Sequence, residues 1–199
     1  MLIRKAKKNK VFQLLAILIT NIIFLTLLHL VEDYFNLNKA ELKNEEDILN
    51  HLAFYSLVII VIAPILEELL YRLPLKRSKF AFFSLLVGII NILIIDLLIL
   101  KIALALYLVG VVYLMYLKKK ITFILIPLSI ILFTVSHVGN YNIEDLELMN
   151  SLDIFFLFLP QLVLGIIVTF IRLKSSFKYA LLYHSLYNST VLFLAIMFD

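Results

Sequence analysis

The sequence predicts an all-α integral membrane protein, a polytopic bundle of about seven transmembrane helices whose N-terminus lies in the cytoplasm. Hydrophobic residues make up 63% of the 199 positions, charged residues make up only 16%, and the mean hydropathy is +1.05. Soluble domains are about half apolar and about one quarter charged, so a soluble fold of this length could not bury so much apolar surface. The lipid bilayer is therefore the expected surrounding of most of the chain.

Seven apolar stretches are candidates for the spans. Roughly 20 apolar residues cross a hydrocarbon core of roughly 30 Å, which leaves a chain of this length room for about seven spans and short loops. The stretches are residues 11–31, 52–72, 81–98, 102–117, 121–138, 154–171 and 178–198. The third and fourth form one apolar block, broken only by Asp96 and Lys101, which we interpret as a hairpin over residues 81–117. We expect a single membrane domain over residues 1–199.

The distribution of charge predicts the orientation of these spans. Four short segments hold 15 of the 18 Lys and Arg residues and no acidic residue: 1–10, 72–79, 118–120 and 172–178. The intervening loops, 32–51 and 139–153, hold ten of the fourteen Asp and Glu residues. Because basic loops stay on the cytoplasmic side of a membrane, this alternation favours seven spans with the N-terminus inside.

The basic residues point to lipid rather than to nucleic acid as the partner. They lie at the ends of apolar runs and form no surface interleaved with aromatic residues, which nucleic-acid binding would require. The basic N-terminal segment precedes a long apolar run without a small-x-small cleavage site, so we expect a retained first span rather than a secretory signal. The chain has no cysteine, which excludes disulfides and thiolate metal sites.

Two consecutive glutamates lie within the second predicted span, although a charged side chain at membrane depth costs several kcal/mol. Glu68 and Arg72 are spaced i,i+4 with the acid first, which favours an ion pair and a structural role for Glu68. Neighbouring helical residues point about 100° apart, so Glu67 is left to face a cavity. Pro64 cannot donate to the carbonyl of Ile60, which predicts a kink just before the glutamates.

Two further spans each carry a histidine at helical spacing from a second polar or aromatic residue. Phe133 and His137 share one face of the fifth span, and His184 and Asn188 share one face of the last. Imidazole and amide donors in lipid need partners, so these residues also predict a polar cavity within the bundle. Interfacial or packing roles, rather than chemistry, are expected for His29, His51, Asn21, Asn91 and Asp96.

These motifs, in their order along the chain, resemble those of the CAAX protease and bacteriocin-processing family, the Abi or type II CAAX prenyl endopeptidase group of intramembrane proteases. The similarity covers roughly residues 52–192 and is carried by Glu67-Glu68-x-x-x-Arg72, Phe133-x-x-x-His137 and His184-x-x-x-Asn188, with Ala63-Pro64 before the first motif and Pro160-Gln161-x-x-x-Gly165 before the last. The chain departs from the family pattern at Leu73-Pro74, where a glycine usually follows the motif arginine, and by the inserted hairpin.

The resemblance implies a peptidase whose active site opens to the cytosol from within the bilayer, with peptide or protein substrates, membrane-anchored ones included. It implies four catalytic residues: the general base Glu67, its assistant His137, and the oxyanion donors His184 and Asn188. Three further residues would support the site: Glu68, Arg72 and Phe133. We expect no cofactor, and the Ile-, Lys- and Asn-rich composition favours a bacterial cell membrane.

A metal-dependent mechanism and two other function classes are the alternatives. Histidines and glutamates also form catalytic zinc sites, for which the ligands would be Glu67, Glu68, His137 and His184. A non-catalytic membrane scaffold or bacteriocin-immunity protein of the same fold could keep the same residues. A small transporter could use the buried Glu and His residues as a proton relay, although the two matching halves with broken helices typical of transporters are not visible.

Overall fold

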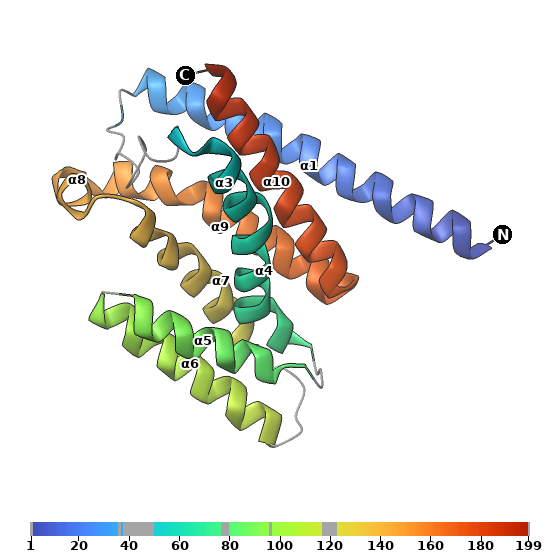
Figure 1. The fold of residues 1–199 in the computed structure, drawn as a ribbon. Coiled ribbons are helices and arrows are strands. Elements are labelled where there is room, and N and C mark those ends of the chain that lie inside the picture. Colours follow the sequence, from blue (N-terminus) through green and yellow to red (C-terminus); the bar gives the residue numbers. More distant parts are fainter. Residues whose placement is uncertain are drawn as a thin grey trace.

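The computed structural model is an all-helical bundle (Figure 1), as the sequence predicts. It describes residues 2–35, 37, 50–76, 80–95, 97–116 and 123–198. Asp96, the cluster 118–120 and most of the loop 32–51 lie outside the described residues. Outside the segment that carries the glutamates, the helices are α1 (Leu2–Tyr34), α5 (Phe82–Ile94), α6 (Leu98–Tyr116), α7 (Leu125–Ser136) with the short turn η4 (His137–Asn140), α8 (Ile143–Leu148), α9 (Ser151–Lys174) and α10 (Phe177–Phe198).

One continuous helical segment, Leu52–Leu75, carries the two glutamates and is called the motif helix below. In chain order it consists of α3 (Leu52–Leu57), the π-helical turn η1 (Val58–Ile62), α4 (Ala63–Glu67), the π-helical turn η2 (Glu68–Arg72) and the short turn η3 (Leu73–Leu75). In a regular α-helix the ring of Pro64 would clash with the carbonyl of Ile60. The wider turn of η1, whose bonds reach back five residues, accommodates the proline at the place where the sequence predicts a kink.

Within the described residues, four helices are long and apolar enough, by length and composition, to cross a membrane: Phe12–Tyr34, Leu52–Leu75, Leu98–Tyr116 and Ser151–Lys174. Two shorter apolar stretches, Phe82–Ile94 and Leu125–Asn140, coincide with other predicted spans, and α10 covers the last one. Large apolar side chains such as Leu93 and Ile99 are exposed on the outer faces of the helices. Because a soluble monomer rarely exposes so much apolar surface, the described part of the chain fits an integral membrane protein.

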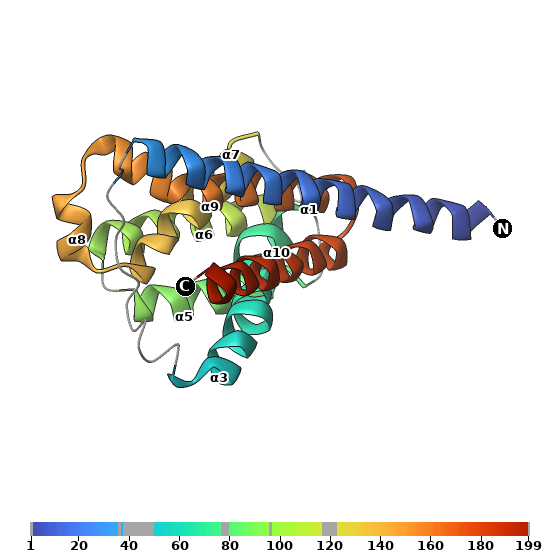
Figure 2. The same ribbon diagram turned by 90° about the horizontal axis from the view of Figure 1, so that it is seen from above.

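The motif helix crosses the other long helices of the bundle obliquely (Figure 1). Helix α7 lies between α9 and α6, α5 pairs with α6, and α10 packs on both α9 and the motif helix. In both views the N-terminus and the α9–α10 turn lie toward one side of the bundle, while α8 lies toward the opposite side (Figures 1 and 2). The basic last turn of α9 and the acidic first turn of α8 are therefore at opposite ends.

Small and polar residues within the spans have distinct packing roles. The side-chain amide of Asn21 in α1 donates to the hydroxyl of Tyr183 in α10 at 3.1 Å, which is the interhelical role expected for Asn21. Asn91 instead donates to the carbonyl of Val87 at 2.9 Å, so this hydrogen bond lies within its own helix. At Gly88 in α5, a Cβ atom would lie 2.6 Å from Leu108 Cδ1 in α6, so the absent side chain lets the two helices approach closely.

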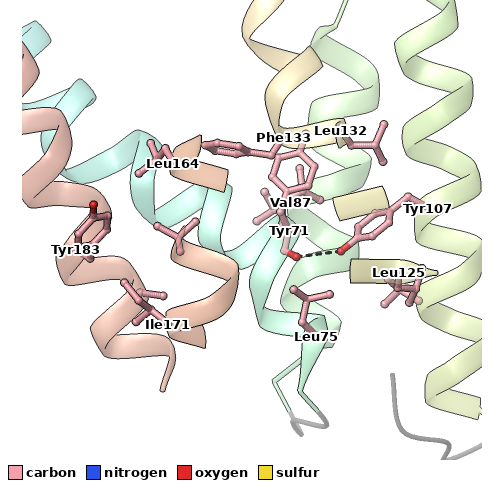
Figure 3. Close-up of a cluster of buried hydrophobic side chains, with 14 of the residues drawn as sticks. Tyr71, Leu75, Val87, Tyr107, Leu125, Leu132, Phe133, Leu164, Ile171 and Tyr183 are labelled. Atoms are coloured by element: carbon pink, nitrogen blue, oxygen red, sulfur yellow. Dashed lines mark hydrogen bonds between the residues drawn. The ribbon is translucent and has the colours of Figure 1, made fainter. Parts of the chain in front are cut away.

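A buried core joins the motif helix to α6 and α7 (Figure 3). The ring centroids of Tyr71 and Tyr107 are 6.3 Å apart, and the ring of Phe133 lies edge-on to Tyr71 at 5.9 Å. The Tyr107 hydroxyl donates to the carbonyl oxygen of Tyr71 at 3.2 Å, which gives the buried phenol the partner it requires. Tyr71, one helical turn after Glu67, is thus held by contacts from both α6 and α7.

Candidate active site

Glu67 and Glu68 lie at the junction of α4 and η2, and their side chains have different surroundings. Glu67, the last residue of α4, keeps 25% of its side chain exposed, whereas Glu68, the first residue of η2, has none exposed. A partly accessible carboxylate can receive water or a substrate, but a fully buried one needs partners within the protein. The two neighbours therefore suit different roles.

Arg72 is one partner of Glu68. Its Nε lies 3.7 Å from Glu68 Oε1 and both side chains are fully buried, so the ion pair predicted from the i,i+4 spacing is present. This distance is too long for a hydrogen bond. Among the described residues, Glu68 Oε2 and the Nε and Nη1 atoms of Arg72 have no hydrogen-bond partner in the protein, so they retain capacity for a water molecule or a peptide group.

His184 reaches both glutamates from α10. Its Nδ1 forms a hydrogen bond with Glu68 Oε1 at 3.1 Å, and its Nε2 lies 3.4 Å from Glu67 Oε2. Since an ionised carboxylate only accepts hydrogen bonds, Nδ1 carries a proton when Glu68 is ionised. The contact between His184 Nε2 and Glu67 Oε2 is attractive when a second proton lies between these two atoms, on either the imidazole or the carboxylate. His184 thereby links the partly exposed side chain of Glu67, whose Oε2 atom is buried, to the fully buried Glu68.

Phe133 brings α7 into this cluster. The Arg72 guanidinium lies 3.9 Å from the centroid of the Phe133 ring, and this cation–π contact is strengthened because both side chains are buried away from water. The same ring lies edge-on to His184, with centroids 5.7 Å apart. Phe133 therefore packs against Arg72 and His184, the two residues that face Glu68.

Gly165 of α9 makes room for the contact between Phe133 and Arg72. A Cβ atom at Gly165 would lie 3.0 Å from Phe133 Cδ1 and 3.4 Å from Arg72 Nη2. The carbonyl of Gly165 accepts a hydrogen bond from Arg72 Nη2 at 3.5 Å. The glycine of the sequence stretch Pro160-Gln161-x-x-x-Gly165 thus lets α9 lie against the arginine.

His137, the predicted assistant of Glu67, joins the cluster through Phe133. The two rings have centroids 4.8 Å apart, as residues on one helical face should, and His137 Nδ1 donates to the carbonyl of Phe133 at 2.8 Å. A carbonyl only accepts, so this bond places the proton of the neutral ring on Nδ1 and leaves a lone pair on Nε2. Within the described part of the chain, no hydrogen bond or ion pair joins His137 directly to Glu67.

Asn188, the second predicted oxyanion donor, contacts the motif helix about two turns before the glutamates. Its Nδ2 donates to the carbonyl of Ile59 in η1 at 2.9 Å. The structure thus brings together Glu67, Glu68, Arg72, Phe133 and His184, and it places His137 and Asn188 at two edges of that cluster.

Three buried residues that the sequence analysis did not single out hold the end of the motif helix. Its carbonyls at Leu70, Tyr71, Arg72 and Leu73 all accept from side chains of other helices. The donors are Ser84 Oγ at 2.8 Å to Leu70, the Tyr107 hydroxyl at 3.2 Å to Tyr71, and Arg172 Nε and Nη2 at 3.0 and 3.1 Å to Arg72 and Leu73. The last carbonyls of a helix lack partners within it, and in lipid such groups must be satisfied by the protein.

Arg172 differs most from its expected role. Arg172 belongs to a basic segment that the sequence predicts to be cytoplasmic. However, only 7% of the residue is exposed, and its side chain points into the bundle. A cation beside the C-terminus of a helix also interacts favourably with the helix dipole. Its position in a basic segment could not reveal this contact, because the partner carbonyls lie 99 and 100 residues away.

The proposed zinc ligands do not form a ligand set in the described structure. Among the residues it describes, no three His, Asp or Glu side chains are arranged to hold a metal ion. His184 directs its ring nitrogens at Glu68 and Glu67, and His137 directs Nδ1 at a backbone carbonyl. We therefore derive no chemical step through zinc and leave metal dependence to experiment.

Comparison with known proteins gives no match, whether to protein-family models, to curated proteins or to solved structures. The chemistry of the cluster then has to indicate the function. A partly accessible carboxylate in contact with an imidazole can take up and return a proton. The buried arginine contacts the neighbouring carboxylate rather than the surface of the cluster, so it can support the accessible groups but does not face a substrate itself.

Proposed function

We propose that this chain is an intramembrane endopeptidase of the CAAX protease and bacteriocin-processing type, in the membrane of a bacterial cell. The observation that supports it best is the meeting of three distant motifs: Glu67, Glu68 and Arg72 on the motif helix, Phe133 on α7, and His184 on α10. Glu68 and His184 are 116 residues apart in the chain yet share a buried hydrogen bond. Residues of these types at these motif positions are what the family resemblance requires.

In the proposed reaction, Glu67 activates a water molecule. Its carboxylate takes a proton from water while the water oxygen attacks the carbonyl carbon of the peptide bond, and that proton then goes to the leaving amine. The contact with His184 orients the Glu67 carboxylate. The lone pair on His137 Nε2 can accept a hydrogen bond from the water molecule and so assist Glu67. The resemblance assigns the developing oxyanion to donors on His184 and Asn188.

The buried pair of Glu68 and Arg72 has a supporting role in this proposal. Glu68 holds His184 through Nδ1, and Arg72 lies beside Glu68 as its counter-charge and packs on Phe133. A comparison of membrane proteomes between cells with the wild-type chain and cells with Glu67→Gln tests the proposal directly. We expect at least one peptide or protein, membrane-anchored ones included, whose cleavage requires Glu67.

The proposed topology has seven crossings with the N-terminus in the cytoplasm. It is supported by the charge bias of the loops and by the opposite positions of α8 and the α9–α10 turn. Reporter fusions should therefore place residues 76, 119 and 174 in the cytoplasm and residues 42 and 146 outside. A cytoplasmic reporter at residue 146 would contradict the seven-span arrangement.

The proposed mechanism requires no metal. Purified protein should keep its peptidase activity after dialysis against a strong chelator, because Glu67 itself is the base. Metal analysis of the same sample is the companion measurement. Stoichiometric zinc that is lost together with activity would replace this mechanism by one in which Glu67, Glu68, His137 and His184 supply the ligands.

A further inference from the structure

Pro64 leaves one carbonyl of the motif helix without its regular backbone partner. In η1 the bonds reach back five residues, and the N–H of Ala63 accordingly donates to the carbonyl of Val58. The next bond of this pattern would run from residue 64 to the carbonyl of Ile59. Proline has no N–H, so this bond cannot form.

Asn188 supplies a donor at that position. Its Nδ2 lies 2.9 Å from the Ile59 carbonyl oxygen, 129 residues away in the chain. An unsatisfied carbonyl inside a bilayer costs several kcal/mol, so a side-chain amide there replaces a bond the helix could not make for itself. Helix α10 packs against η1, α4 and η2, which brings the amide into reach.

The same face of α10 makes a second contact one turn earlier. His184 precedes Asn188 by four residues, about 6 Å along the helix, and it contacts Glu67 and Glu68. On the motif helix the order of the two contacts is reversed, because Ile59, the partner of Asn188, precedes the glutamates. A buried polar contact at His184 and a partly buried one at Asn188 therefore connect α10 to the motif helix, and together they define the register of one helix against the other.

We infer that Asn188 is a positioning residue that replaces the N–H missing at Pro64 and thereby places His184 between Glu67 and Glu68. This role is separate from the proposed chemistry, because it concerns the fold of η1 and holds whether or not the chain is a peptidase. It makes the proline and the asparagine a functional pair, although they lie on different spans.

The pairing is tested by combining Asn188→Ala with Pro64→Ala. Asn188→Ala alone should lower the melting temperature of the purified protein in detergent by a few degrees and lower activity, because the Ile59 carbonyl loses its donor. Aspartate has the same shape as asparagine but no N–H when it is ionised, so Asn188→Asp should have the same effects as Asn188→Ala. In the Pro64→Ala background residue 64 regains its N–H, so the loss of melting temperature caused by Asn188→Ala should shrink and activity should partly recover.

Thr190→Val is the matched control on α10. The Thr190 hydroxyl donates to the carbonyl of Leu186 within its own helix, so its removal should have the same small effect in both backgrounds. An Asn188→Ala loss of melting temperature that is equal with Pro64 and with Ala at position 64 overturns the inference. Lost activity with an unchanged melting temperature also overturns it, and would leave Asn188 as an oxyanion donor only.

Hydrogen–deuterium exchange provides a second measurement if Pro64→Ala does not accumulate. Asn188→Ala should increase amide exchange in peptides that cover η1, whereas Thr190→Val should not. Unchanged exchange in η1 would overturn the inference. Because melting and exchange need no substrate, failure of this inference is distinguishable from failure of the proposed peptidase activity.

Discussion

Glu67→Gln is expected to abolish peptide cleavage while the protein still accumulates and folds as the wild type does. Glutamine is nearly isosteric with glutamate and keeps hydrogen-bonding capacity toward His184, so the change removes little besides the basic carboxylate. A positioned general base contributes about 10²–10⁴-fold to a rate, and we expect a loss of this size in the cleavage rate. The measurement is product formation from a substrate identified in membrane proteomes, at matched membrane abundance.

Glu147→Gln is the control for this experiment. Glu147 lies on α8 with an exposed side chain, so its neutralisation changes the net charge equally without touching the cluster. It should leave the cleavage rate unchanged. Full biological activity of Glu67→Gln would contradict the peptidase proposal and favour the non-catalytic scaffold or immunity protein instead.

Glu68→Gln is expected to act through stability as well as activity. Glu68 and Arg72 are both fully buried, so removal of one charge leaves the other without compensation. Removing one partner of a buried ion pair lowers the free energy of unfolding by about 3–5 kcal/mol. Arg72→Gln should have a similar effect, because it also removes the cation packed on Phe133 and the donor to Gly165. Thermal unfolding in detergent and membrane abundance are the measurements.

The double change distinguishes a coupled pair from two independent losses. Once Glu68 is neutral, Arg72 no longer has its counter-charge, so Arg72→Gln should cost less in the Glu68→Gln background than in the wild type. Additive effects on the melting temperature would show that the 3.7 Å contact contributes no coupling.

The two glutamates of the site differ in exposure, so their substitutions should have different effects. They are adjacent in sequence and chemically identical, but one is a quarter exposed and the other is completely buried. Glu67→Gln should therefore separate activity from stability, whereas Glu68→Gln should reduce both. A structural role for the whole cluster would instead make the two variants alike.

The sequence alone was sufficient for the features that depend on composition and local spacing. Apolar content predicted an all-helical membrane protein, since lipid requires each span to satisfy its own backbone. The spacing of Glu68 and Arg72 predicted their ion pair, and that of Phe133 and His137 predicted that they share a helical face, on which their rings are in contact. Pro64 marked where the motif helix departs from regular α geometry.

Contacts between helices could be decided only by the tertiary structure. The sequence indicated that His184 and Asn188 need polar partners, but not that these are the two glutamates and the carbonyl of Ile59. It likewise did not reveal that Ser84, Tyr107 and Arg172 cap the last carbonyls of the motif helix. The physical reason is that helical periodicity determines which residues share a face, whereas the register and crossing of helices follow from packing between segments as far as 162 residues apart.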